Sequence, residues 1–388
     1  MTAPAEVLWL SPELGPDARA GGQIRTTRLL QALGRHATVD VVAVQPWTID
    51  SHVTAQRANA RTVITARRRH PVGARLLAVR HGWPIAGGAL WRGDIASLVR
   101  RRSAAGAVVV LDHEAMLVYG RDAERAVVLL HNIESQRVPE NGSASRRPDR
   151  GWERRRYRRL ESRLAPGSGP LAVTVSERDA RSIGHGIVVP NGADLPATPP
   201  PLDPDGPALF VGALDYRPNA EALRWFVERV APHLGRGRLP LQVVGRAASA
   251  LPADLARHPA LDVVGEVDDV GPYLGAAGIV VAPLREGGGT RLKVVEALAW
   301  GRPVVTTTKG AEGLELVAGR DALFADDAPS FAAAMELLAT DHACARRMAA
   351  AGRRAVQPYS WDVIGAAFAG AVLARAEPWR RGSRGRVG

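Results

Sequence analysis

Several residue types are scarce in this sequence of 388 residues, and each scarcity excludes a class of protein. Cys344 is the single cysteine, which excludes an internal disulfide and a zinc site built on clustered cysteines. The longest apolar run, near 364–374, is shorter than the roughly 18 residues that a membrane-spanning helix needs. Residues 1–20 hold no basic region followed by an apolar run. We therefore expect no signal peptide and a cytoplasmic protein.

Lysine is also scarce, because the 51 basic residues comprise 49 arginines and only two lysines. Such a skew indicates codon bias, so the formal net charge of +12 does not by itself indicate a polyanionic partner. The densest basic cluster is RRPDRGWERRRYRRLESR at 146–163, which predicts a helix. This helix is either a solvated face or a surface for an acidic acceptor or for anionic lipid on the inner face of the membrane. No aromatic stacking platform accompanies the charge, so we expect no nucleic-acid partner.

The apolar residues, 46% of the chain, form short runs that alternate with longer amphipathic segments. This alternation predicts parallel strands covered by helices, in two doubly wound α/β domains. The expected strands are 7–10, 39–44, 108–111, 127–131, 171–175 and 187–189, then 208–211, 241–244, 261–264, 278–282 and 303–306. The expected limits are a first domain over 1–190, a proline- and glycine-rich linker over 191–207, a second domain over 208–360, a helix over 361–376 that packs back on the first domain, and a basic tail over 377–388.

The most informative segment is GGGTRLKVVEALAWGRPVVTT at 287–307, which predicts a glycine loop, a helix and a strand. Thr290 is the expected N-cap, so Arg291 and Lys293 fall in the first turn, where a cation opposes the helix dipole unless an anion binds. Together with the N–H groups of the loop, these cations predict a phosphate site. Glu296 lies on nearly the same helix face as Lys293 and can accept hydrogen bonds from sugar hydroxyls. The sequence therefore predicts a nucleotide-sugar site.

Other interpretations of this segment are weaker. The simplest is a glycine-rich crossover loop whose two cations are solvated. A Walker-type nucleotide site needs Lys followed by Ser or Thr after its last glycine, whereas Gly289 is followed by Thr290 and Arg291. The first strand, 7–10, does not lead into a G-x-G-x-x-G turn, which argues against a nicotinamide or flavin dehydrogenase.

Over nearly its whole length the sequence resembles the GT-B glycosyltransferases, specifically the family usually numbered four, whose members retain the anomeric configuration of the donor. The segments that carry the resemblance are LHNIES at 130–135, VTVSERDA at 173–180, VVPNGAD at 188–194, FVGALDYRPNAEALRWF at 210–226, VGEVDDVGPYL at 264–274, 287–307 and GAEGL at 310–314. The resemblance implies two Rossmann-like domains that face a central cleft, the first on the acceptor side and the second binding the donor. It also implies transfer of a sugar from a nucleoside diphosphate sugar to an acceptor hydroxyl with retention, with UDP or GDP as the expected nucleotide.

Glu296 matches the second glutamate of the family's paired-glutamate motif, which implies that it holds the ribose hydroxyls. The first glutamate, expected at the donor sugar, stands eight positions earlier in the family, where this sequence has Gly288. Glu286 is the nearest acid, and we expect it to take that role; the alternatives are loop amides or an exposed acid without function. The other loop residues expected at the donor are Gly287, Gly289 and Thr290.

The resemblance also places an arginine and a lysine from the start of the second domain on the diphosphate. Arg217 matches the arginine, but no lysine follows it closely. We therefore expect Arg291 and Lys293 to take part in binding the diphosphate. Arg217 is alternatively a surface turn residue. In the first domain, Gly21 and Gly22 match the loop that faces the donor diphosphate and the acceptor.

Three more residues of the first domain are candidates because they follow strands. The resemblance implies that His131 contacts the donor sugar, and a core histidine is the alternative. Asp112 and His113 are weaker candidates for contact with the acceptor. Arg25, just inside the first helix, either assists at the donor or is solvated.

The expected mechanism needs neither a metal nor a dedicated base. Asp268 and Asp269 are adjacent at a helix start and do not form the Asp-x-Asp pair that holds a catalytic metal. In the family's front-face mechanism a donor phosphate oxygen deprotonates the acceptor. The expected acceptor loops, 46–62, 66–94 and 113–126, contain no motif that identifies the acceptor. A glycolipid, a polysaccharide and a natural product are therefore all possible acceptors. The alternative functions are a nucleotide-sugar epimerase or phosphorylase of the same fold and a non-catalytic membrane-surface scaffold.

Overall fold

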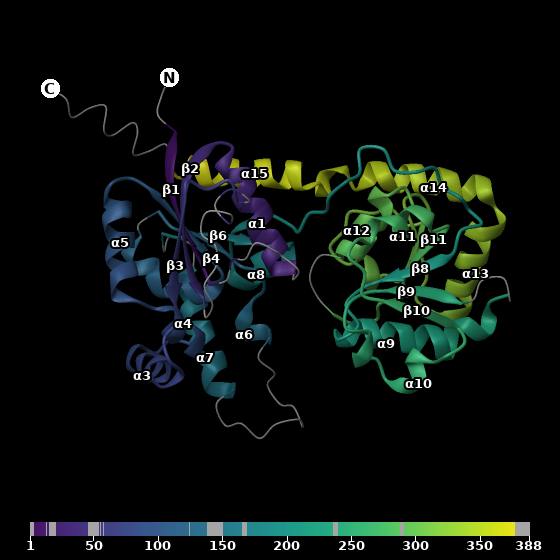
Figure 1. Cartoon of the computed structure of the whole chain (residues 1–388), viewed down its shortest axis with the longest axis horizontal. Coiled ribbons are helices and arrows are strands. Elements are labelled where there is room, and N and C mark those ends of the chain that lie inside the picture. Colours follow the sequence, from purple (N-terminus) through teal and green to yellow (C-terminus); the bar gives the residue numbers. More distant parts are fainter. Residues whose placement is uncertain are drawn as a thin grey trace. The chain divides into compact units, whose positions relative to one another are not determined.

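The computed structural model describes residues 4–12, 14, 21–45, 54, 56, 58–123, 125–137, 150–164, 169–235, 240–287 and 291–376. The chain divides into two compact units, one of Met1–Pro190 with Trp361–Gly388 and one of Asn191–Ser360. Each unit contains a parallel sheet covered by helices (Figure 1). The predicted fold class, with two Rossmann-like domains, is confirmed. In the described ranges, no helix is long and apolar enough to cross a membrane.

The sheet of the first unit has the order β3-β2-β1-β4-β5-β6-β7, with neighbouring strands parallel. Its strands are β1 (Ala5–Ser11), β2 (Ala37–Gln45), β3 (Thr62–Arg67), β4 (Val108–Asp112), β5 (Val127–Leu129), β6 (Leu171–Thr174) and β7 (Ile187–Val188). The chain order reverses between β1 and β4, and ligands of such sheets bind beyond the carboxyl ends of the strands at this switch point. Ser11 and Asp112, the last residues of these two strands, lie there.

Helices cover both faces of this sheet because its strands are buried on both sides. On β1, Leu8 and Leu10 join a core cluster that includes Ile95 of helix α5 (Gly93–Ala104). Trp9 points to the opposite face, where its ring meets Phe368 edge-on with centroids 5.9 Å apart. Phe368 belongs to α15 (Trp361–Ala374), which packs against α1 (Gly21–Gly34).

The remaining elements of the first unit correct two sequence predictions. The segments 66–94 and 113–126, expected as loops, contain helices, and the edge strand β3 was not expected. The elements are α3 (Pro71–His81), α4 (Ile85–Leu90), the 3-10 helix η1 (Glu114–Asp122), α6 (Glu134–Arg137), α7 (Arg150–Glu161), the 3-10 helix η2 (Ser162–Leu164) and α8 (Glu177–Ile183).

The second unit repeats the same topology, with the order β10-β9-β8-β11-β12-β13. Its strands are β8 (Ala208–Val211), β9 (Leu241–Val244), β10 (Leu261–Gly265), β11 (Ile279–Ala282), β12 (Val304–Thr306) and β13 (Leu323–Phe324). Its longer helices are α9 (Arg217–Trp225), continued by the π-helical turn η3 (Phe226–Val230), α12 (Leu292–Ala299), α13 (Ala328–Thr340) and α14 (His342–Ala355). Its shorter elements are α10 (Ala253–Ala256), α11 (Gly271–Ala276), and the 3-10 turns η4 (Ala231–His233), η6 (Ala248–Ala250), η7 (Lys309–Ala311) and η8 (Gln357–Tyr359). The switch point lies between β8 and β11.

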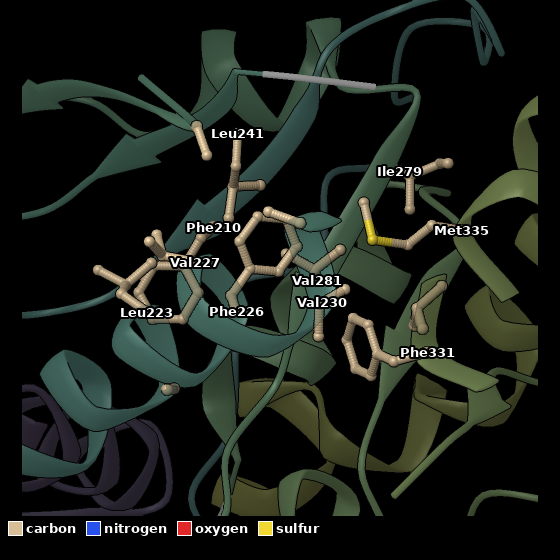
Figure 2. Packing of buried hydrophobic residues seen from close by; sticks show 14 of the residues in the cluster. Phe210, Leu223, Phe226, Val227, Val230, Leu241, Ile279, Val281, Phe331 and Met335 are labelled. Atoms are coloured by element: carbon tan, nitrogen blue, oxygen red, sulfur yellow. The ribbon is translucent and has the colours of Figure 1, made fainter. Parts of the chain in front are cut away.

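The core of the second unit lies between this sheet and the helices α9 and α13. Phe210 and Val281 from the strands pack with Phe226 and Phe331 from the helices (Figure 2). Burying these aromatic side chains fixes α9 against the sheet, which determines where its first residues stand relative to the strand ends.

The proline-rich segment 191–207 falls within the second unit. Arg302 is fully buried and donates hydrogen bonds to the carbonyl oxygens of Pro200, Pro201 and Ala277. Proline nitrogens carry no hydrogen to donate, so the proline-rich segment forms no regular secondary structure. The Arg302 side chain supplies donors to the carbonyl groups of this segment instead.

Candidate functional site

Lys293, in the first turn of α12, is a partly buried cation of the second unit. Its Nζ donates a hydrogen bond of 2.6 Å to Oδ1 of Asn219 and lies 4.1 Å from the centre of the Phe210 ring. Gly212, directly after β8, makes room for it, since an ideal Cβ there would lie 2.7 Å from the Nζ. The ammonium thus sits beside the carboxyl end of β8, at the switch point of the sheet.

Two shifted pKa values mark this end of α12. Burial and the nearby Arg291 lower the pKa of Lys293 to about 7, against a partial opposing effect of Glu296. Burial raises the pKa of Glu296 to about 7, Lys293 counteracts this, and Asp194 adds to it. A bound anion would favour the charged form of Lys293 and would therefore raise this pKa.

Arg291 is not in the first helical turn as the sequence predicts, but is the N-cap of α12. The residue is 5% exposed, and burial lowers the pKa of its guanidinium. The guanidinium donates to the carbonyl oxygens of Lys309 at 3.1 Å and Gly287 at 2.9 Å, and contacts Glu312 at 3.3 Å. Arg291 therefore ties the glycine loop to the 310–314 segment.

Arg217 and Glu286, predicted at opposite ends of the donor, pair with each other. Nε and Nη2 of Arg217 each donate a hydrogen bond of 3.1 Å to one carboxylate oxygen of Glu286. The side chains are 77% and 40% exposed, so both can rearrange toward a ligand at little energetic cost. Arg217 is the first residue of α9, which places this pair at the same end of the sheet as Asn219.

The glycine loop is described only up to Gly287, and the predicted binding residues Gly288, Gly289 and Thr290 lie outside the described residues. Gly287 has φ of 99°, a conformation that favours glycine. An ideal Cβ there would be 3.1 Å from the hydroxyl oxygen of Tyr216 and 3.3 Å from Nη1 of Arg291. Glycine at this position keeps the approach to both side chains open.

In the first unit the candidate site is a hydrogen-bonded pair, Asp112 and His131. Nε2 of His131 lies 2.7 Å from Oδ1 of the buried Asp112, whose other oxygen accepts hydrogen bonds from Ser11 at 2.8 Å and Thr26 at 2.9 Å. Burial alone would raise the pKa of Asp112. The hydrogen bond and the charge of His131, together with the hydrogen bonds from Ser11 and Thr26, outweigh burial and hold this pKa below its usual value. The carboxylate therefore accepts the Nε2 proton, and in the neutral imidazole this leaves Nδ1 as an acceptor. An ideal Cβ on Gly22, at the start of α1, would lie 4.0 Å from this Nδ1.

The loop that carries His131 is held by two carboxyl groups that the sequence analysis missed. Buried Glu114 accepts a hydrogen bond of 3.0 Å from the backbone N–H of Glu134. Glu161 accepts hydrogen bonds from the N–H of Ser135 at 3.0 Å and from its hydroxyl at 2.6 Å. Burial and the neighbouring Glu161 charge raise the pKa of Glu114 well above its usual value. His113, in turn, is the cap of η1 with φ of 94° and accepts a hydrogen bond from the N–H of Ala115.

Arg25 is neither solvated nor directed at a ligand. It is 1% exposed, and its guanidinium donates to the carbonyl oxygens of Val189 at 2.6 Å and Pro190 at 2.8 Å. Burial lowers its pKa to about 10, against the opposing charge of Asp112. Arg25 thus fastens the start of α1 to the segment that follows β7.

Asn219 and Gly212 are the further candidates that sequence reasoning missed. Both lie in the FVGALDYRPNAEALRWF segment, so their positions after a strand and in the next helix were visible. Their contact with Lys293, 74 residues from Asn219, was not. Asp269, by contrast, accepts a hydrogen bond of 2.8 Å from the N–H of Gly271, the first residue of α11. Within the described part of the chain, no three His, Cys, Asp or Glu side chains form a group suited to a metal ion.

Comparison with known proteins agrees with this geometry. Residues 207–341 match the family model described as glycosyl transferases group 1. The chain carries a group 1 glycosyltransferase domain. The matched range includes Asn219, Lys293 and Glu296. No curated protein shows a significant match to the sequence.

Solved structures extend the similarity to the whole chain and identify the fold as GT-B. The sucrose-phosphate synthase of Thermosynechococcus elongatus has a TM-score of 0.65 at 17% identity, covering 97% of this chain and 98% of that one. Anabaena HepE in complex with UDP and glucose has a TM-score of 0.67 at 14% identity, covering 95% and 100%. The lipopolysaccharide outer core galactosyltransferase WaaB has a TM-score of 0.63 at 9% identity, covering 95% and 99%.

Proposed function

We propose that this protein is a retaining hexosyltransferase that moves a sugar from a nucleoside diphosphate sugar to an acceptor hydroxyl. The observation that carries the proposal is the partly buried ammonium of Lys293 at the switch point of the second sheet, hydrogen-bonded to an amide rather than to a carboxylate. A diphosphate is the ligand chemistry that compensates such a cation. UDP is the proposed nucleotide because the similar HepE structure is described with UDP, and GDP is the alternative.

The proposed roles follow from the positions of the side chains. Lys293 and Arg217 bind the diphosphate, and Arg291 shapes the loop whose N–H groups, including those of Gly287, Gly288, Gly289 and Thr290, face the phosphates. Glu296 accepts hydrogen bonds from the ribose hydroxyls. Glu286, next to Arg217, accepts hydrogen bonds from the hydroxyls of the donor sugar. In the first unit, His131 contacts the sugar through Nδ1, and Gly21 and Gly22, the first residues of α1, take the proposed place beside the donor diphosphate.

Catalysis in this proposal comes from charge. Breaking the glycosidic bond to the nucleotide places additional negative charge on the leaving diphosphate, so fixed cations bind the transition state more tightly than the substrate. Lys293 contributes most at a pH below about 7, and the arriving diphosphate extends its charged range upward. A donor phosphate oxygen takes the proton of the acceptor hydroxyl, so no side chain serves as a dedicated base.

Cys344 is the sole cysteine, which fits the reducing cytoplasm where nucleoside diphosphate sugars are used, so we place the proposed reaction there. Glycolipids, polysaccharides and natural products are the proposed acceptor classes.

The test is to incubate the protein with UDP-, GDP-, ADP- and TDP-sugars, with and without an acceptor panel, and to measure nucleotide release. The anomeric configuration of any product is then read by NMR. We expect release from one nucleotide class and a product with the donor's configuration. A folded protein that binds none of these nucleotides contradicts the proposal, inversion contradicts its mechanism, and conversion of the donor without acceptor identifies an epimerase.

A further inference from the structure

Helix α3 exposes an apolar stripe to solvent. Val72, Leu76 and Val79 are 61%, 67% and 65% exposed, which makes them the three most exposed large hydrophobic side chains among the described residues. A helix turns about 100° per residue, so these three side chains lie within an arc of about 60°. On the opposite side, Ala74 and Ala78 are buried. The helix is therefore packed through its small residues and directs its large ones outward.

Two arginines border this stripe. In the same projection, Arg75 lies about 40° beyond one edge and Arg80 about 40° beyond the other. Both are exposed. Neither forms an ion pair with any carboxylate in the part of the chain that the structure describes. The sequence contains no aspartate or glutamate between Asp50 and Asp94, so the surroundings of the helix along the chain are cationic as well.

The helix is held in this orientation by close packing. Gly88 of α4 approaches α3 so closely that an ideal Cβ there would lie 2.2 Å from the carbonyl oxygen of Ala74. At the other end, Gly82 ends α3 with φ of 67° and lies beside the arginine cluster of α7, since an ideal Cβ on it would be 2.8 Å from Nη1 of Arg159. A cation at a helix C-terminus is also favoured by the helix dipole. The exposed stripe thus belongs to a fixed helix.

Part of the basic cluster predicted at 146–163 therefore contributes to this surface, and part does not. Arg159 is exposed and adjoins α3. Arg156 is buried and donates to the carbonyl oxygen of Trp83, so it supports the turn after α3. Residues 146–149 lie outside the described residues.

We propose that α3 docks the first unit onto an anionic lipid bilayer, with Val72, Leu76 and Val79 in the interface and Arg75 and Arg80 at the lipid phosphates. Exposed apolar side chains bordered by arginines suit the boundary between headgroups and acyl chains, where burial of apolar area and attraction to anionic lipid add together. A second copy of the chain is a less favourable partner for this face. In a symmetric dimer through α3, the arginines of one copy would face those of the other and repel them. The proposal is independent of the donor site in the second unit.

The test is co-sedimentation of the full-length protein with vesicles of phosphatidylcholine alone or with about one third phosphatidylglycerol, at low and high salt. We expect binding only to the anionic vesicles, weakened by salt. The double variant Leu76→Asp with Val79→Asp abolishes this binding, and Arg75→Gln with Arg80→Gln weakens it by about tenfold or more.

Matched controls come from the second unit. Leu337, 44% exposed on α13, is replaced by Asp, and the exposed Arg346 and Arg347 of α14 are replaced by Gln. These variants keep vesicle binding, and all variants keep the thermal stability of the parent. Wild-type protein that fails to bind anionic vesicles, α3 variants that bind as well as wild type, or a Leu76-dependent dimer in solution without vesicle binding would each overturn the proposal.

Discussion

Nζ of Lys293 and Oδ1 of Asn219 lie 2.6 Å apart and join the start of α12 to α9 beside the carboxyl end of β8. The contact brings together two segments that are far apart in the sequence, and among the described residues no carboxylate forms an ion pair with this partly buried cation. Such an arrangement lowers stability in the free protein and is retained where an anionic ligand compensates it.

Gly212 tests whether the exact position of this ammonium matters. Gly212→Ala places a methyl group where an ideal Cβ is 2.7 Å from both Nζ of Lys293 and Nδ2 of Asn219. Both atoms end flexible side chains, so we expect a folded protein with a displaced ammonium and a donor affinity reduced by about tenfold or more. Calorimetric titration with the donor measures this. Gly370→Ala on α15, where nothing lies within 4 Å of the added Cβ, is the control and leaves affinity unchanged.

Glu296 makes stability depend on pH in a defined direction. Its folded-state pKa is raised to about 7 from 4.5, so the folded protein binds this proton more tightly than the unfolded chain does, and ionisation costs more in the folded protein. The resulting loss of stability is absent below about pH 4.5, grows as the pH rises and is complete above about 7. Glu296→Gln removes it, so we expect the variant to gain stability over wild type between pH 5 and 7.5, by up to about 3 kcal/mol. Thermal unfolding at both ends of this range checks it, and a difference that is constant with pH would refute it.

The pair of Arg217 and Glu286 separates function from stability. Both side chains are more than a third exposed, so breaking their ion pair changes the unfolding free energy by only about 0–1 kcal/mol. If they bind the donor, Arg217→Ala and Glu286→Ala each lower kcat/KM by about tenfold or more. The comparison is the exposed pair of Arg246 and Asp215, whose single alanine variants we expect to leave kcat/KM unchanged. Equal kinetic effects in both pairs would argue against a donor role.

Asp112 is predicted to act by positioning His131. In Asp112→Asn the amide donates to Nε2, so the proton of the imidazole moves to Nδ1 and the proposed acceptor becomes a donor. We expect kcat to fall by about tenfold or more with little change in donor KM. Thr26→Val removes one hydrogen bond to the same carboxylate but keeps the tautomer, and it retains most of the activity. If both variants lose activity equally, Asp112 has only a structural role.

The sequence predicted β8 to β12 of the second unit closely, because each is a short apolar run between turn residues, but it did not predict β13 (Leu323–Phe324). The predicted limits 208–211 and 241–244 coincide with β8 and β9. It did not predict β3, whose residues Thr62–Arg67 mix apolar, polar and charged side chains on a sheet edge. The same holds for α3: apolar residues lie on both its buried and its exposed face, so the sequence shows no amphipathic period.

Candidate site residues were visible in the sequence only where local chemistry was unusual. Two cations after three glycines marked Arg291 and Lys293, but the cap position of Arg291 depends on its contacts with Lys309 and Glu312. The buried role of Arg25 depends on the carbonyl groups of Val189 and Pro190, more than 160 residues away. Contacts of this kind are set by the packing of whole units, which single-sequence patterns do not encode.

The most direct test of the account is calorimetric titration of wild-type protein and of Lys293→Ala with UDP and GDP near pH 7. The exposed Arg229→Ala serves as a control for loss of one positive charge. The account predicts that wild type and Arg229→Ala bind one of these nucleotides with the same affinity and that Lys293→Ala binds it at least about tenfold more weakly. Undiminished binding by a folded Lys293→Ala protein would contradict the central claim that this ammonium holds the diphosphate.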